Sequence, residues 1–185
     1  MVRAFFYMIE RLDWFCRKAT SLCGFVACIL MLLMLLNVFY DVVMRYVFND
    51  VSIGMQELEW HLFAAVFLLG TPYAMQRDGH VRVDIFYEGW SDQRKAIVNL
   101  VGALIFIFPF VALVTYYGAS FAHDAYSIGE GSGDPGGLPY RWIIKSLIPI
   151  SFIFIGIAAL GMMTKAILVL KGRAHYQQDN KGMLS

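Results

Sequence analysis

The chain has 185 residues, of which 59% are hydrophobic and 16% are charged, and its formal net charge is only +1. A soluble domain of this size would expose much of that apolar surface to water, so the composition excludes an ordinary soluble protein. We expect an all-α integral membrane protein that contacts membrane lipids. It should bind no nucleic acid, because the sequence has no basic groove with interleaved aromatic residues.

Residues 1–18 predict an amphipathic helix. Phe5, Ile9 and Leu12 recur at helical spacing, and the charged residues fall largely elsewhere on the helical wheel. Trp14 is placed to anchor this helix at the level of the lipid headgroups. We therefore expect the segment to lie in the plane of the membrane interface, with a plain cytosolic extension as the alternative.

Four stretches of low charge follow and form a predicted membrane domain over residues 19–170. The predicted spans are residues 19–45, 52–76, 96–122 and 143–170, and residues 171–185 form a polar cytoplasmic tail. The third span has 27 residues, which correspond to about 40 Å of helix. We expect it to tilt or to bend at Pro109, because the bilayer core is thinner than that.

Lysine and arginine are distributed unevenly between the two predicted sides of the membrane. Twelve belong to the two terminal segments and the 77–95 connection, whereas three belong to the other side. Positively charged residues favour the cytoplasmic side of a membrane. We therefore expect both termini and the 77–95 connection in the cytoplasm, and the 46–56 and 123–142 loops outside.

The uncharged part of the second predicted span is too short to cross the apolar core of a membrane. Only residues 62–76 are free of charge, and at 1.5 Å per residue they cover about 22 Å of a core that is about 30 Å thick. The polar residues at its outer end must lie at or inside the apolar slab, where such groups indicate a functional site. These residues are Glu57, Glu59 and His61, with Trp60 beside them and Arg45 of the preceding span as the counter-charge within the chain.

Two readings of this outer end stay open. In one, Glu57 and His61 share a helix face and form a polar patch that grips a partner helix, an ion or a substrate. In the other, the carboxylates reach headgroup water while Trp60 anchors the interface.

The connection after the second span carries a group of charged residues, namely Arg77, Asp78, His80, Arg82 and Asp84. The alternation of apolar and polar residues does not separate a strand from an interfacial helix here. His80 has no second His or Cys at ligand spacing, so we expect a structural hydrogen bond rather than a metal site.

No catalytic arrangement is apparent in the sequence. The glycines of the 123–142 loop do not form a phosphate-binding loop, because GxxxxGK[ST] is absent, and turn formation explains them. No nucleophile stands with a base and an orienting partner. We therefore expect neither an enzyme nor a bound cofactor.

Several motifs follow one another along the chain: Arg45-Tyr46-Val47-Phe48-Asn49, Glu57, Glu59-Trp60-His61, Phe67-Leu68-Leu69-Gly70 and Asp78-Gly79-His80-Val81-Arg82-Val83-Asp84. In this order, with four spans, they resemble the small membrane subunit of TRAP transporters, the DctQ-like family. The segment Asp134-Pro135-Gly136-Gly137-Leu138-Pro139-Tyr140-Arg141, followed by Lys145 and Ile148-Pro149, is similar to a subgroup named for mannitol or chloroaromatic compounds. The resemblance covers roughly residues 20–170.

The resemblance implies a tripartite, sodium-driven secondary transporter for organic acids in a bacterial inner membrane. In that family a periplasmic substrate-binding protein delivers the substrate, and a large permease subunit carries the substrate and sodium sites. This chain would be the small scaffold subunit, which packs against the large subunit and helps to dock the binding protein. The sequence agrees, since it lacks the internal repeat and broken helices typical of a transporter core.

The resemblance also implies roles for individual residues. Packing inside the membrane or against the large subunit would involve Arg45, Glu57, Glu59, Trp60, His61 and Gly70. Docking of the binding protein would involve Asp50, Glu130, Asp134 and Arg141.

A four-helix membrane anchor that binds haem b is the alternative function. Such anchors hold the haem between histidines of facing helices. His61 and His123 both fall toward the predicted outer side and would be the ligands.

Overall fold

The computed structural model describes residues 2–77 and 89–174, with side chains from Phe6 onward. The predicted site residues Asp78, His80, Arg82 and Asp84 lie outside the described residues. All regular structure in the described part is helical, which confirms the all-α prediction. The elements are α1 (Val2–Val47), α2 (Ile53–Gln76), α4 (Asp92–Gly102), the π-helical turn η1 (Ala103–Ile107), α5 (Phe108–Ser127) and α6 (Trp142–Leu170).

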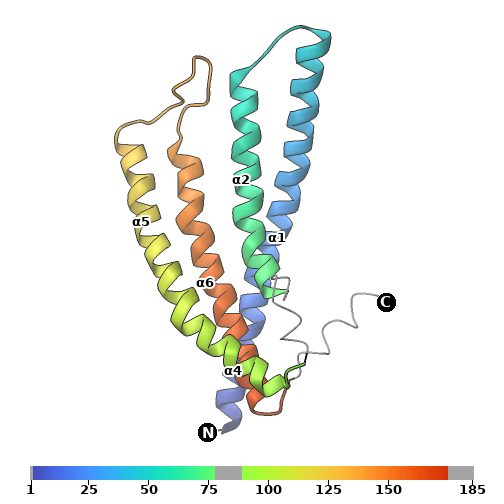
Figure 1. Cartoon of the computed structure of the whole chain (residues 1–185), viewed down its shortest axis with the longest axis vertical. Coiled ribbons are helices and arrows are strands. Elements are labelled where there is room, and N and C mark those ends of the chain that lie inside the picture. Colours follow the sequence, from blue (N-terminus) through green and yellow to red (C-terminus); the bar gives the residue numbers. More distant parts are fainter. Residues whose placement is uncertain (1, 78–88, 175–185) are drawn as a thin grey trace.

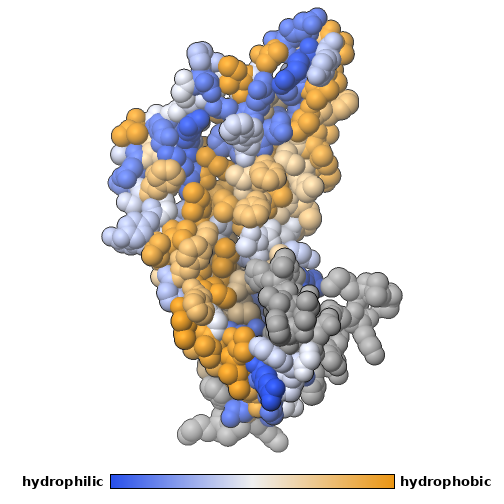
Figure 2. Space-filling view, in the orientation of Figure 1, coloured by the Kyte–Doolittle hydropathy of each residue, from blue (hydrophilic) through white to orange (hydrophobic). Residues whose placement is uncertain are grey.

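The helices form an elongated bundle in which α6 is central, because it packs against α1, α2, α4 and α5. The loop from α1 to α2 and the loop from α5 to α6 lie at one end, which we call the loop end (Figure 1). The beginning of α1 and the beginning of α4 lie at the opposite end, which we call the base. Figure 2 shows hydrophilic residues gathered at the loop end and apolar surface on the bundle below it.

Three helices of the described part are long and apolar enough to cross a membrane, namely Phe6–Val47, Asp92–Ser127 and Trp142–Leu170. The chain is therefore a multi-pass membrane protein. Helix α2 is not among the three, in keeping with the polar residues near its start and the short uncharged run that follows them. The four predicted spans coincide with helices or fall almost wholly within them, but the membrane crossing of α2 and the orientation stay predictions.

Helix α1 differs from the expectation at its beginning. Residues 2–47 form one uninterrupted helix of 46 residues, so residues 1–18 are not a separate element. The physical reason is that neither glycine nor proline occurs before Gly24 to interrupt the helix. Phe6 and Ile9 also pack on Leu168 of α6, which holds the first turns in the bundle. The position of these turns in the plane of the membrane stays a prediction.

The helical run of residues 92–127 changes geometry at η1, which ends two residues before Pro109. Proline has no N–H to donate to the carbonyl four residues earlier, and its ring collides with that carbonyl. A π turn widens the helix locally and accommodates both effects. The irregular turn thus lies where the sequence predicts a bend.

Glycines allow two of the helix contacts to be close. A Cβ at Gly24 of α1 would lie 2.5 Å from Cγ of Tyr73 in α2, and a Cβ at Gly161 of α6 would lie 2.6 Å from Oε1 of Gln76. Small residues at such positions let membrane helices approach one another. A Cβ at Gly70 of α2, in contrast, would meet nothing within 4 Å.

This difference predicts the effect of adding a methyl group. Gly24→Ala should lower the free energy of unfolding by about 1–3 kcal/mol, because the Tyr73 ring has to move. Gly70→Ala is the matched control and should leave the stability of the isolated chain unchanged or slightly higher. Unfolding of the detergent-purified chain, followed by circular dichroism, measures both. Equal stability of the two variants would contradict the close contact between α1 and α2.

Candidate functional site

The carboxylate of Glu57 joins the start of α2 to the loop between α5 and α6. Its Oε2 accepts a hydrogen bond of 2.6 Å from the Leu138 N–H. Its Oε1 accepts hydrogen bonds from the Ser132 hydroxyl and, at 3.3 Å, from Nη2 of Arg141. Only 13% of the Glu57 side chain is exposed. We call these four residues the Glu57 cluster.

The local sequence of the loop brings these donors together. Gly137 donates its N–H to the Asp134 carbonyl at 3.0 Å, with Pro135 and Gly136 between them. Gly136 has a φ of 84°, as the third residue of a type II turn requires, and proline favours the second position. A Cβ at Gly137 would collide with the Ser132 side chain and lie 2.8 Å from Oε2 of Glu57. Only glycine fits at this position.

A second ion pair closes the same loop on its other side. Nζ of Lys145 in α6 lies 2.5 Å from Oε2 of Glu130, and both side chains are largely buried. The same Nζ lies 3.9 Å from the ring centre of Phe121 in α5. Arg141 also donates its N–H to the Glu130 carbonyl at 3.0 Å. The loop end therefore has a defined shape between α2, α5 and α6.

The prediction that Arg45 is the counter-charge of Glu57 is wrong. Arg45 pairs with Asp41 in its own helix, with Nη2 and Oδ2 2.5 Å apart, and Arg141 pairs with Glu57 instead. The spacing of four residues between Asp41 and Arg45 was a signal for this helical pair. Asn37 links α1 to α2, since its Nδ2 donates to the Met55 carbonyl at 2.9 Å.

The other polar residues near the start of α2 do not join the Glu57 cluster. Glu59 is half-buried, and Trp60 is 76% exposed. Nδ1 of His61 is buried without a hydrogen-bond partner among the described residues. His123 is exposed near the end of α5, so the geometry gives no support to haem ligation by the two histidines. The described part of the chain contains no group of acidic, His or Cys side chains that could hold a metal ion.

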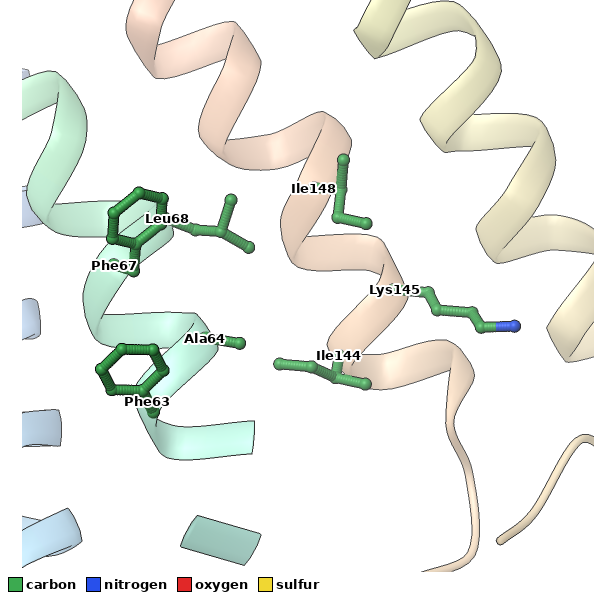
Figure 3. A pocket seen from close by; sticks show the side chains of 7 residues that line it. All are labelled: Phe63, Ala64, Phe67, Leu68, Ile144, Lys145 and Ile148. Atoms are coloured by element: carbon green, nitrogen blue, oxygen red, sulfur yellow. The ribbon is translucent and has the colours of Figure 1, made fainter. Parts of the chain in front are cut away.

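An apolar groove lies between α2 and α6 (Figure 3). Its volume is about 460 Å³, and it is lined by Phe63, Ala64, Phe67, Leu68, Ile144, Lys145 and Ile148. Lys145 contributes only its stem, because its amine points away toward α5.

Aromatic side chains continue the groove onto the outer surface of α2. Trp60, Phe63 and Phe67 share one helix face and are 76%, 61% and 67% exposed. We call these three residues the α2 aromatic face. Gly70 follows one turn further along, with open space beside it.

The residues predicted to dock a partner fall into two classes. Asp50 and Asp134 are exposed carboxylates that make no ion pair in the described structure. Glu130 and Arg141 are engaged in ion pairs that hold the loop. At the other end of α2, Arg77 is exposed and lies over the Tyr73 ring, 5.5 Å from its centre.

Comparison with known proteins gives one family. A family model described as "Tripartite ATP-independent periplasmic transporters, DctQ component" matches residues 34–168. This range contains all of α2, α4 and α5, the Glu57 cluster and the groove. No curated protein matches the chain.

The Glu57 cluster predicts that the stability of the chain depends on the charge of Glu57 much more than on the charge of Glu59. Glu57→Gln should lower the midpoint of thermal unfolding by about 4–8 °C, because the hydrogen bonds to a charged acceptor are weakened. Glu59→Gln removes the same charge two residues away, outside the cluster, and should shift the midpoint by less than about 2 °C. Light scattering or circular dichroism of the purified chain in detergent measures both. Similar shifts for the two variants would refute the role of the cluster.

Proposed function

The chain belongs to the DctQ family of tripartite ATP-independent periplasmic transporters, and from this premise we propose that it is the small scaffold subunit of a sodium-coupled transporter for organic acids. The family match confirms the resemblance predicted from the motifs. In this role the chain packs against a large permease subunit and helps to dock a periplasmic substrate-binding protein. The similarity to the mannitol or chloroaromatic subgroup stays a prediction.

The observation that best supports a scaffold role is the incomplete cover of α2. This helix carries polar residues at its start and is less apolar than the three helices of the described part that are long and apolar enough to cross a membrane. Polar groups within a membrane need protein around them. Among the described residues, helices α1 and α6 cover one side of α2, whereas the α2 aromatic face and Gly70 remain open. A membrane helix of the large subunit is the cover that we propose for this open side.

The proposed topology has four spans and both termini in the cytoplasm of a bacterium, with α2 crossing as part of the assembled complex. The loop end then faces the periplasm and the base faces the cytoplasm. In this orientation the exposed carboxylates of Asp50 and Asp134 meet the binding protein. Glu130 and Arg141 act indirectly, because their ion pairs shape the loop that the binding protein contacts.

Truncation of the α2 aromatic face tests the contact with the large subunit. Phe67→Ala should reduce co-purification of the large subunit at least about fivefold, because truncating a central aromatic contact typically costs more than 1 kcal/mol of binding free energy. Phe25→Ala on α1 is the matched control, since Phe25 and Phe67 are 63% and 67% exposed. Both variants are tagged, expressed to equal levels and purified in mild detergent. Loss of the large subunit with Phe25→Ala, but not with Phe67→Ala, would place the contact elsewhere.

Charge reversal at the loop end tests docking of the binding protein. In proteoliposomes that contain both membrane subunits, Asp134→Lys should raise the concentration of binding protein needed for half-maximal uptake roughly two- to fivefold. The amount of assembled complex should not change, because Asp134 is exposed. Arg141→Glu should instead reduce the amount of complex, because it places two carboxylates together at Glu57. Unchanged uptake by Asp134→Lys and Asp50→Lys would argue against docking at these residues.

A further inference from the structure

Four of the described cations toward the base differ in their partners from the cations of the loop end. At the loop end, Arg45, Arg141 and Lys145 each pair with a carboxylate of the chain. Toward the base, four exposed cations lie over aromatic rings and form no ion pair in the described structure. The pairs are Arg11 with Tyr7, Lys18 with Trp14, Arg77 with Tyr73 and Arg173 with Phe6. These four cations therefore present positive charge toward the base that no described carboxylate neutralises by an ion pair.

Two of these pairs form a row on the exposed face of α1. The Arg11 guanidinium carbon lies 5.7 Å from the Tyr7 ring centre, and Nζ of Lys18 lies 5.0 Å from the Trp14 ring centre. Residues 7, 11, 14 and 18 follow one another at steps of four, three and four, so they share one helix face. Tyr7 and Trp14 are 62% and 59% exposed. We call this row the α1 cation–ring row.

The opposite face of the same turns is buried. Phe6 and Ile9 pack on α6, and Oδ1 of Asp13 accepts a hydrogen bond of 3.3 Å from the Thr164 hydroxyl. Asp13 also pairs with Arg17 at 2.5 Å, which takes Arg17 out of the unneutralised set. The orientation of α1 is thereby fixed, and the cation–ring row points away from the bundle.

The surroundings of the row suit only one layer of a membrane. Met8, Leu12 and Phe15 flank it and are also exposed, so full hydration would leave a large apolar surface in water. The hydrocarbon core would be an even less favourable environment for the row, because Arg11 and Lys18 would lose their hydration. The headgroup layer accepts rings and cations together. With 46 residues, α1 is about 69 Å long, more than twice the thickness of the core, so its length reaches this layer.

We propose that the α1 cation–ring row binds the phosphate groups of anionic phospholipids. The rings sit at the boundary with the acyl chains, and stacking holds each cation extended toward the phosphate. Among the described residues, Glu10 is an exposed acidic neighbour of the row, yet Arg11 and Lys18 leave the row net positive. This proposal depends only on the membrane location of the chain and not on its role in a transporter.

Native mass spectrometry of the full chain in detergent tests the proposal. The probe is an equimolar mixture of phosphatidylglycerol and phosphatidylcholine with matched acyl chains. The wild-type chain should retain phosphatidylglycerol preferentially. The double variant Arg11→Gln and Lys18→Gln should lose about tenfold or more of this preference, because each cation that a ring holds at the phosphate layer should contribute about fivefold. Trp14→Leu, which keeps apolar bulk but removes a ring, should lose part of it.

The control has the same change in charge at the same end. Arg94 and Lys171 are exposed cations that lie over no ring in the described structure, and Arg94→Gln with Lys171→Gln should change the preference less than twofold. An equal loss in this control would overturn the proposal, since net charge alone would then explain the binding. Unchanged lipid preference in the Arg11 and Lys18 variant, with its circular dichroism intact, would also overturn it. If that variant lost a co-purifying protein instead, the row would be a protein contact.

Discussion

The carboxylate of Glu57 has to be satisfied by donors inside the protein. It lies near the start of a helix that packs within a membrane domain, and little of its surface is open to water. The chain meets this requirement with a hydroxyl, a backbone N–H and a guanidinium from a loop that is distant in sequence. Because Arg141 directly precedes α6, the same contacts fix where α6 begins relative to α2.

The groove between α2 and α6 follows from this arrangement. At the loop end the two helices are joined through the polar Glu57 cluster, whereas nearer the base Met75 packs on Ala158 and Ala159. Small residues bring the helices together there. Between these two attachments the large side chains of Phe63 and Phe67 lie outward. The groove is thus set by contacts above and below it, and a partner can fill it without disturbing either.

Much of the fold could be predicted from the sequence because it depends on local properties. The runs of apolar residues predict where the helices lie. The short uncharged run predicts that the polar residues at the start of α2 form a site. The continuity of α1 depends on the absence of a helix breaker before Gly24, a signal that the amphipathic pattern of residues 1–18 obscured. The partners of Glu57 could not be found in this way. Ser132, Leu138 and Arg141 are more than 70 residues away, and no periodicity links a loop to a helix across that separation.

The turn at residues 134–137 has a consequence for attaching reporters to the loop. Gly133 precedes this turn and Gly137 is its last residue, but a Cβ at Gly133 meets nothing within 4 Å, whereas one at Gly137 collides with Ser132. Two glycines only four residues apart therefore differ in whether they tolerate a larger side chain. A cysteine at position 133 offers a labelling site at the loop end, close to the Glu57 cluster yet outside its contacts. A fluorophore there would sense an approaching protein while the native loop stays folded.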